Sequence, residues 1–236
     1  MTWRSLISSS LLAIGMALGA DFRTSVELTD SRDPAVRKKR DFSGVVVWLE
    51  PSLGRPAPLP PKVHTMEQRD KRFLPHLLAI PVGATVDFPN LDPIYHNAFS
   101  NFAGQPFDTG LYRPGTTQKV TFRREGVVRV FCNIHSTMSA VIVVLRTPFF
   151  AVSATDGSLR IENVPPGEYR LNVFHERASQ ELLAKLAAKV TVSEAGLTLP
   201  VIRISEAAFL AVPHKNKYGL DYPPPASDSL YPGGRK

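Results

Sequence analysis

Short apolar runs separated by proline and glycine constrain this chain more than any other feature of its sequence. The chain contains 21 prolines among 236 residues, and proline neither donates a backbone hydrogen bond nor continues a helix. β-branched residues are frequent in the apolar runs, which favours strands over helices. Many short strands with regular turn signals predict a β-sandwich. The expected strands are 44–49, 77–81, 85–88, 119–122, 127–131 and 140–145.

A second region with the same strand-and-turn rhythm begins after 146–148. Val164-Pro165-Pro166-Gly167 is a turn signal, because proline fixes φ and glycine tolerates a positive φ. Residues 181–189 have a helix-forming composition, although a long connection fits them equally. We therefore predict an all-β protein with a second, smaller sandwich. Its expected strands are 158–161, 169–174, 189–192 and 197–204.

The N-terminus resembles a secretory signal. Arg4 precedes the apolar run 11–18, and small residues follow at Gly19 and Ala20. The alternative is a transmembrane anchor, but the run is too short to span a bilayer. We expect a signal peptide at 1–20, a periplasmic or secreted protein, and no later membrane span.

The chain is basic, with a formal net charge of +7. Much of this charge lies in 32–40 and 69–72. Solvated loops are the simplest explanation, and attraction to an acidic redox partner or an anionic surface is the alternative. Nucleic acid is not an expected partner, because an exported chain without an aromatic and basic surface lacks the features that read it.

The single cysteine is the most informative residue for function. Cysteines of exported proteins normally pair, so Cys132 is buried and inert, joined to another chain, or bound to a metal. It begins the pattern Cys132-x-x-His135-x-x-Met138, and His96 ends a separate expected strand. One thiolate, two imidazoles and a weak thioether form the blue-copper ligand set. Core packing remains an alternative for Cys132 and Met138, and zinc is a poor rival because methionine is not among its usual ligands.

Two motifs make residues 44–145 similar to the cupredoxins, the family of plastocyanin, amicyanin and azurin. One is 80–97, which ends in His96-Asn97, and the other is 126–138, which ends in a ligand loop of amicyanin length. The resemblance implies a Greek-key sandwich with one copper ion, cycling between Cu(I) and Cu(II). It also implies that Asn97 approaches the Cys132 sulfur through its backbone N–H and ties the two ligand loops together. Ser136 departs from amicyanin, which has proline there.

Residues 156–171 resemble the carboxypeptidase regulatory-like and transthyretin-like sandwiches. This resemblance implies a structural or binding module without an activity of its own. Some bacterial proteins of this two-domain type carry the loose name methylamine utilisation protein, which establishes no substrate. The expected domains are a signal peptide at 1–20, a copper domain at 21–146, a second sandwich at 147–205, and an extended or disordered tail at 206–236.

The predicted function is single-electron transfer between periplasmic redox partners, without catalysis. A copper enzyme would need a further cluster of histidines, unless subunits shared ligands. A non-redox copper-binding protein, or an adhesion module with structural copper, is a further alternative. A secondary metal role for His76 stays open. Because all four expected ligands precede Arg146, the residues after it are expected to be dispensable for the copper spectrum.

Overall fold

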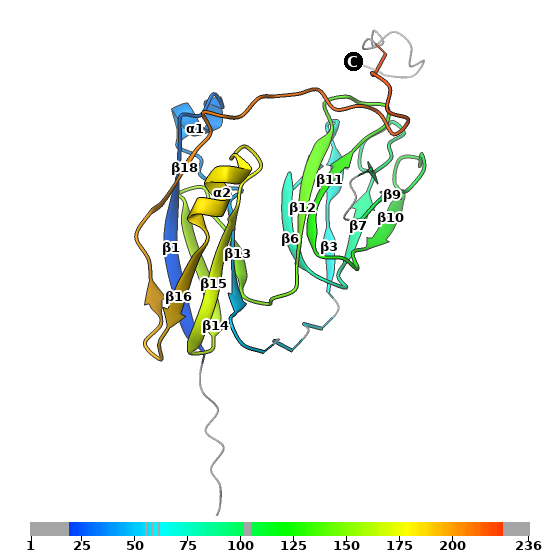
Figure 1. The fold of residues 1–236 in the computed structure, drawn as a ribbon. Helices are drawn as coiled ribbons and strands as arrows, with labels where there is room; N and C mark the ends of the chain where they lie inside the picture. The colour runs from blue at the N-terminus through cyan, green and yellow to red at the C-terminus, as the bar shows by residue number, and fades with distance from the viewer. Residues whose placement is uncertain (1–18, 55, 58, 61, 102–104, 224–236) are drawn as a thin grey trace, which may run out of the picture.

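A computed structural model describes residues 19–54, 56–57, 59–60, 62–101 and 105–223. Nearly all of its regular structure is β, arranged as two sandwiches (Figure 1). The predicted all-β class is confirmed. The predicted signal peptide lies outside the described residues, apart from Gly19 and Ala20.

The central sandwich, residues 63–145, has two main sheets and a small hairpin. Phe88, Val130 and Ile142 are among the side chains that fill its core. One sheet has the order β10-β7-β3, the other β6-β12-β11-β8-β9, and β4 pairs with β5. The bounds are β3 (Val63–Thr65), β4 (Glu67–Arg69), β5 (Arg72–Leu74), β6 (Leu77–Pro81), β7 (Thr85–Pro89), β8 (Phe99–Ser100), β9 (Phe107–Asp108), β10 (Thr117–Thr121), β11 (Gly126–Phe131) and β12 (Ser139–Leu145).

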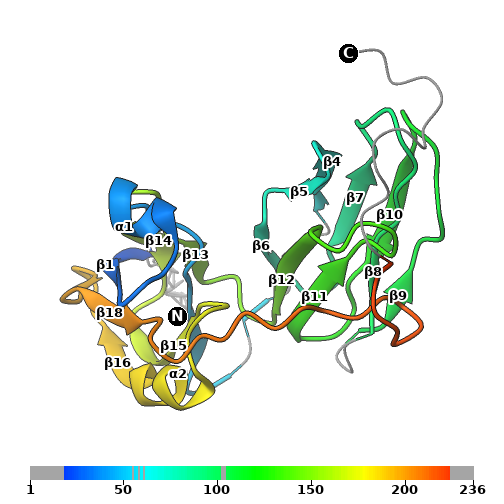
Figure 2. The same ribbon diagram turned by 90° about the horizontal axis from the view of Figure 1, so that it is seen from above.

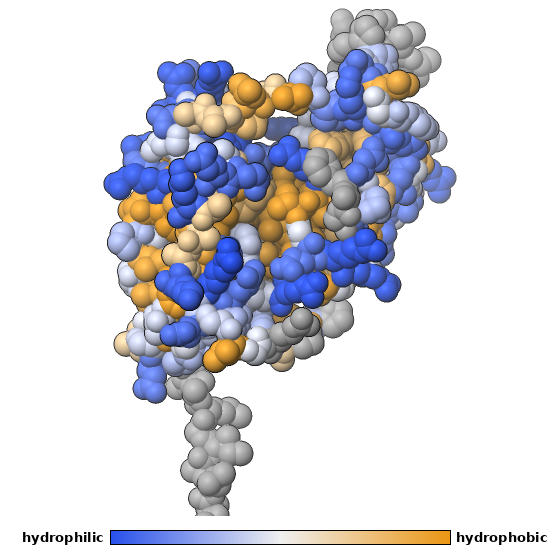
Figure 3. Space-filling view, viewed as in Figure 1, coloured by the Kyte–Doolittle hydropathy of each residue, from blue (hydrophilic) through white to orange (hydrophobic). Residues whose placement is uncertain are grey.

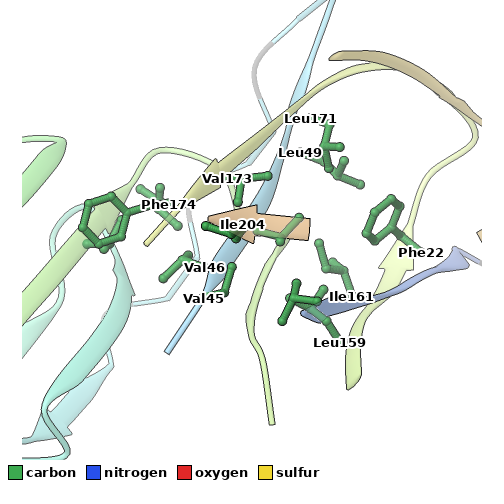
Figure 4. Close-up of a cluster of buried hydrophobic side chains, with 14 of the residues drawn as sticks. Phe22, Val45, Val46, Leu49, Leu159, Ile161, Leu171, Val173, Phe174 and Ile204 are labelled. Carbon is green, nitrogen blue, oxygen red and sulfur yellow. The ribbon is translucent and has the colours of Figure 1, made fainter. Parts of the chain in front are cut away.

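The outer sandwich consists of two four-stranded sheets that enclose a core of aliphatic and aromatic side chains (Figure 4). In one sheet β1 lies between β14 and the pair β17 and β18, and the other has the order β13-β2-β15-β16. The bounds are β1 (Ala20–Thr29), α1 (Pro34–Lys39), β2 (Val46–Pro51), β13 (Phe150–Val152), β14 (Ser158–Val164), β15 (Gly167–Phe174), α2 (Gln180–Leu186), β16 (Ala188–Val192), β17 (Leu197–Thr198) and β18 (Ile202–Ser205).

This pairing corrects the predicted domain boundaries. β1 is antiparallel to β14, with Ala20 opposite Val164, and β2 is antiparallel to β15, with Leu49 opposite Leu171. Residues 20–51 therefore belong to the outer sandwich and not to the copper domain predicted at 21–146. The second sandwich, predicted at 147–205, needs β1 and β2. Without β1, β14 would not be joined to β17 and β18, and without β2, β13 would not be joined to β15.

β12 joins the two sandwiches. Its side chains alternate, as in any strand, and both faces are buried. Ala140, Ile142 and Val144 lie in the central core. The opposite face is continuous with the outer core and includes Val141 and Val143. The two sandwiches therefore share one apolar contact along β6 and β12, which lie beside the outer sandwich in both ribbon views (Figures 1 and 2).

Residues 206–223, the described part of the tail predicted at 206–236, contain no helix or strand. They leave β18 and cross from the outer sandwich to the far end of the central one (Figures 1 and 2). Among the described residues, no helix has the length and apolar character needed to cross a membrane.

Candidate metal centre

His96 lies in the loop that follows β7, and its backbone is fixed on both sides. Its N–H donates to the carbonyl of Tyr112 at 3.2 Å, and the Tyr112 N–H donates to the His96 carbonyl at 2.8 Å. The Tyr112 hydroxyl in turn donates to the carbonyl of Phe88 at 2.9 Å. The imidazole is fully buried. The loop therefore presents His96 in one position at the end of the central sandwich.

Asp92 orients the His96 ring. Its carboxylate lies 2.8 Å from His96 Nε2, and it also accepts the backbone N–H groups of Asp70 and Lys71 at 2.7 and 2.9 Å. Burial opposes ionisation of Asp92, but these hydrogen bonds outweigh it and lower the pKa of the carboxyl. A carboxylate acceptor at Nε2 places the proton there and leaves the Nδ1 lone pair available for a metal.

The other predicted ligands lie in the loop between β11 and β12. The Cys132 N–H donates to the Met138 carbonyl at 3.2 Å, and the Met138 N–H donates to the His135 carbonyl at 3.1 Å. These two bonds close the loop on itself. A closed loop of this length directs the side chains of Cys132 and His135 to the same side, toward His96.

Three ligand atoms converge at this point. His96 Nδ1 lies 3.1 Å from His135 Nδ1, and Cys132 Sγ lies 3.8 Å from His96 Nδ1 and 3.6 Å from His135 Nδ1. A point equidistant from atoms so spaced lies about 2.0 Å from each, close to the ~2.0–2.1 Å of zinc–nitrogen bonds and slightly below the ~2.3 Å of zinc–sulfur bonds. The triangle therefore has the size that a first-row transition metal needs. Among the described residues, these three are the one group of histidine, cysteine, aspartate or glutamate side chains whose ligand atoms lie close enough together to hold a metal ion.

The surroundings of the cluster keep both imidazoles in the neutral form that can donate a lone pair. Burial, with the nearby positive charges of His96 and Lys71, lowers the pKa of His135 to about 4. Burial also lowers the pKa of His96, although Asp92 opposes this effect. Both imidazoles are therefore neutral at neutral pH and can donate a lone pair. Burial raises the pKa of the Cys132 thiol, so a bound metal would have to displace its proton.

Asn97 connects the two ligand loops. Its side-chain oxygen accepts the N–H of Asn133 at 2.7 Å. Backbone N–H groups of Asn97, Ile134 and His135 also favour the Cys132 thiolate, against the larger opposing effect of burial. The cupredoxin resemblance implies two contacts for Asn97, namely the side-chain bond between the two ligand loops and the approach of its backbone N–H to the Cys132 sulfur, and the structure contains both.

Met138 is fully buried among the side chains of the central core, directly before β12. This burial accounts for Met138 as a packing residue, and its role as a ligand stays a prediction. His76 is not part of the cluster. Its ring nitrogens face the Ser139 carbonyl at 3.0 Å and the Glu176 carboxylate at 2.9 Å, so it links the two sandwiches.

Four further residues around the site were not predicted. Asp92 stands within the 80–97 motif, but nothing in that motif indicates a bond to His96. The other three come from the segment after β18. The Tyr222 hydroxyl donates to the Cys132 carbonyl at 2.7 Å, the Lys217 N–H donates to Asn133 Oδ1 at 2.9 Å, and the His214 ring stacks on Phe131. The expectation that residues after Arg146 are dispensable overlooked these contacts.

No protein-family model matches the sequence, and no curated protein matches it. Several solved structures are similar to parts of it. A copper-containing nitrite reductase from Thermus scotoductus is 30% identical with a TM-score of 0.35, over 41% of this chain and 25% of the reductase. This chain thus spans about a quarter of that enzyme.

Two smaller proteins are also similar. A copper(I) amicyanin variant is 17% identical, with a TM-score of 0.34, over 35% of this chain and 82% of amicyanin. A purple cupredoxin from Nitrosopumilus maritimus is 24% identical, with a TM-score of 0.32, over 35% of this chain and 99% of that protein. The resemblance of the second sandwich to carboxypeptidase regulatory-like domains stays a prediction.

Proposed function

We propose that this protein binds one copper ion through His96, Cys132 and His135, with Met138 as a weak axial ligand, and carries single electrons between redox partners in the periplasm. Copper bound there would accept one electron as Cu(II) and release it as Cu(I). The surrounding residues would keep the ligands in place during both steps. The convergence of one thiolate and two neutral imidazoles is the observation that carries the proposal.

The donor set supports copper over zinc. Structural zinc sites have four ligands, commonly with two or more cysteines. Here the described cluster has one buried cysteine. A soft thiolate with two imidazoles and a buried thioether nearby suits copper, which accepts a long and weak fourth bond.

The exposure of the two histidines supports an electron carrier. His96 is fully buried, whereas His135 is half-buried and Ile134 beside it is exposed. Three exposed hydrophobic side chains lie next to buried residues of the same region. Leu91 and Tyr95 are in the His96 loop, and Leu111 precedes Tyr112, which pairs with His96. A small apolar contact of this kind suits a transient redox complex, because such complexes bury little area. We therefore propose that electrons pass through the outer edge of His135.

Electron self-exchange between two copies tests the proposal without a known partner. The copper-loaded protein is expected to give a reversible one-electron wave in voltammetry and measurable self-exchange by NMR line broadening. Ile134→Lys should slow self-exchange by at least about tenfold, because like charges meeting across a contact are repelled. Leu53→Lys is the matched control, since Leu53 is also exposed but lies in the turn after β2, in the other sandwich.

Two results would contradict the proposal. The absence of a reversible wave would remove electron transfer as the function. Equal slowing by Ile134→Lys and Leu53→Lys would show that electrons do not leave beside His135.

A further inference from the structure

The chain after β18 forms a strap from the outer sandwich to the candidate copper site. We define the strap as residues 206–222. It begins at Glu206, which is buried and accepts hydrogen bonds from His175 Nε2 at 2.7 Å and Arg177 Nε at 2.9 Å. From 209 to 214 it spans a cavity between the sandwiches, and apolar surface is visible along this crossing (Figure 3). The strap is therefore fixed to the outer sandwich at its first residue, and its middle bridges the gap to the central sandwich.

At the far end, Lys217 closes a ring of hydrogen bonds. Its backbone N–H donates to Asn133 Oδ1 at 2.9 Å, and the Asn133 N–H donates to Asn97 Oδ1 at 2.7 Å. Asn97 Nδ2 donates to Asp108 Oδ1 at 3.2 Å, and the Lys217 ammonium returns to Asp108 Oδ2 at 2.7 Å. The ring connects the His96 loop, the Cys132 loop, β9 and the strap. It fixes which way the Asn97 amide points, because its oxygen and its nitrogen each have one partner.

Tyr222 and His214 make a second contact. The Tyr222 hydroxyl donates to the Cys132 carbonyl at 2.7 Å and lies 3.2 Å from His214 Nδ1. The His214 ring stacks on Phe131, the residue before Cys132, with ring centroids 4.1 Å apart. The strap therefore holds the backbone of the thiolate residue itself, and not only the rim of the site.

We propose that the strap tunes the copper centre. Lys217 and Tyr222 are positioning residues that raise the reduction potential of the bound copper. The inference rests on the proposed copper site. The hydrogen bonds of both residues go to groups around the ligand atoms. Lys217 acts through Asp108, Asn97 and Asn133, and Tyr222 acts through the peptide group of Cys132.

Both residues should shift the potential in the same direction. A hydrogen bond to the Cys132 carbonyl draws electron density from the thiolate residue, which weakens its support for Cu(II). Loss of the Lys217 charge would leave the Asp108 carboxylate unpaired near the site, and a negative charge favours the more highly charged Cu(II). Polar contacts around the ligands of a metal are known to tune it in this way. Removing either group should therefore lower the reduction potential.

The test compares two variants with two matched controls in the full chain. Tyr222→Phe removes one hydroxyl, and its control Tyr169→Phe removes a hydroxyl that donates to the Pro165 carbonyl at the same 2.7 Å in the outer sandwich. Lys217→Met removes one ammonium, and its control Lys215→Met breaks the exposed pair with Asp221 in the same segment. Each copper-loaded protein is measured by voltammetry and by the position of its thiolate-to-copper absorption band.

Tyr222→Phe and Lys217→Met are expected to lower the potential and move the band, while both controls match the unmodified protein. Variants that match the unmodified protein, or controls that shift equally, would overturn the role of the strap and leave the copper site intact. An unmodified protein without the absorption band would instead overturn the proposed function. Because Tyr222→Phe retains the ring, it keeps the test valid if Lys217→Met folds poorly.

Discussion

Two buried histidine–carboxylate pairs occur in the part of the chain that the structure describes, one in each sandwich, and they differ in what faces the second ring nitrogen of the histidine. His96 Nε2 lies 2.8 Å from Asp92, and His175 Nε2 lies 2.7 Å from Glu206. Both imidazoles are almost completely buried. The second nitrogen of His175 faces the Gly44 carbonyl at 3.4 Å, whereas that of His96 faces Cys132 Sγ and His135 Nδ1.

This difference separates a structural histidine from a candidate ligand. Oxygen acceptors face both ring nitrogens of His175, so its ring links backbone and carboxylate. At His96 the carboxylate accepts the proton on Nε2, so the lone pair of Nδ1 points toward Cys132 Sγ and His135 Nδ1. Three ligand atoms that face one another in this way can share a bound cation. Burial and a carboxylate partner alone therefore do not identify a metal ligand. The surroundings of the other nitrogen do.

The largest expected effect separates the two histidines. His96→Ala should abolish the intense thiolate-to-copper band, because the cluster loses one of its three converging atoms. His175→Ala should keep the band but lower the free energy of unfolding by about 3 kcal/mol, because it leaves part of a buried ionic network without its partner. Visible spectra and denaturant titrations of both variants check this. The comparison fails if the two variants lose the band equally.

A smaller effect is expected from the two carboxylates. Asp92→Asn should keep copper binding but weaken Cu(II) affinity by roughly 10–100-fold, because an amide is a weaker acceptor for His96 Nε2–H and makes the imidazole a poorer donor. Glu206→Gln should leave the affinity unchanged. Competition with a copper chelator measures both. An equal loss of affinity would show that Asp92 acts through general stability.

The smallest effect concerns a third and partly exposed pair, His76 with Glu176. The hydrogen bond that His76 donates to the Glu176 carboxylate raises the pKa of His76 above 6.5. Burial would raise the pKa of Glu176, but His76 and the nearby Arg177 outweigh it, so that this pKa falls below 4.5. The stability from His76 is thus fully present below 6.5 and is lost as the pH rises through its raised pKa. The stability from Glu176 is lost as the pH falls through its lowered pKa.

The contribution should be below about 1 kcal/mol, because solvent screens exposed ion pairs. Denaturant unfolding of the unmodified protein and of His76→Gln across roughly pH 5 to 9 measures it as a difference. That difference should shrink toward the alkaline end. A difference that grows with pH would rule out an ion pair between the sandwiches.

Local sequence patterns predicted most strands but not how distant strands pair. The run at 77–81 coincides with β6, and the run at 127–131 falls within β11, which begins one residue earlier. β1 was not predicted, although its buried positions, which include Phe22, Val26 and Leu28, alternate with polar ones as in a half-buried strand. Its partner β14 lies far along the chain, and no local pattern indicates such a pairing. The domain boundary was therefore placed wrongly.

The site shows the same division. The spacing Cys132-x-x-His135 lies within one loop, so local sequence predicted that two donors converge. Asp92 lies only four residues before His96, but the spacing alone does not show that its carboxylate turns toward the ring, where the Asp70 and Lys71 N–H groups of the β4–β5 turn also hold it. Lys217 and Tyr222 could not be predicted, because they lie in a segment with little apolar pattern and reach Asn133 and Cys132 only through the path of the whole chain.

Adding Cu(II) to the metal-free protein tests the central claim most directly, with Cys132→Ser measured beside it. The unmodified protein should bind one equivalent and show an intense thiolate-to-copper band with a narrow copper hyperfine splitting in electron paramagnetic resonance. Cys132→Ser should show neither, because a hydroxyl is a poor soft ligand. Spectra that are the same for both proteins would contradict a copper centre built on Cys132.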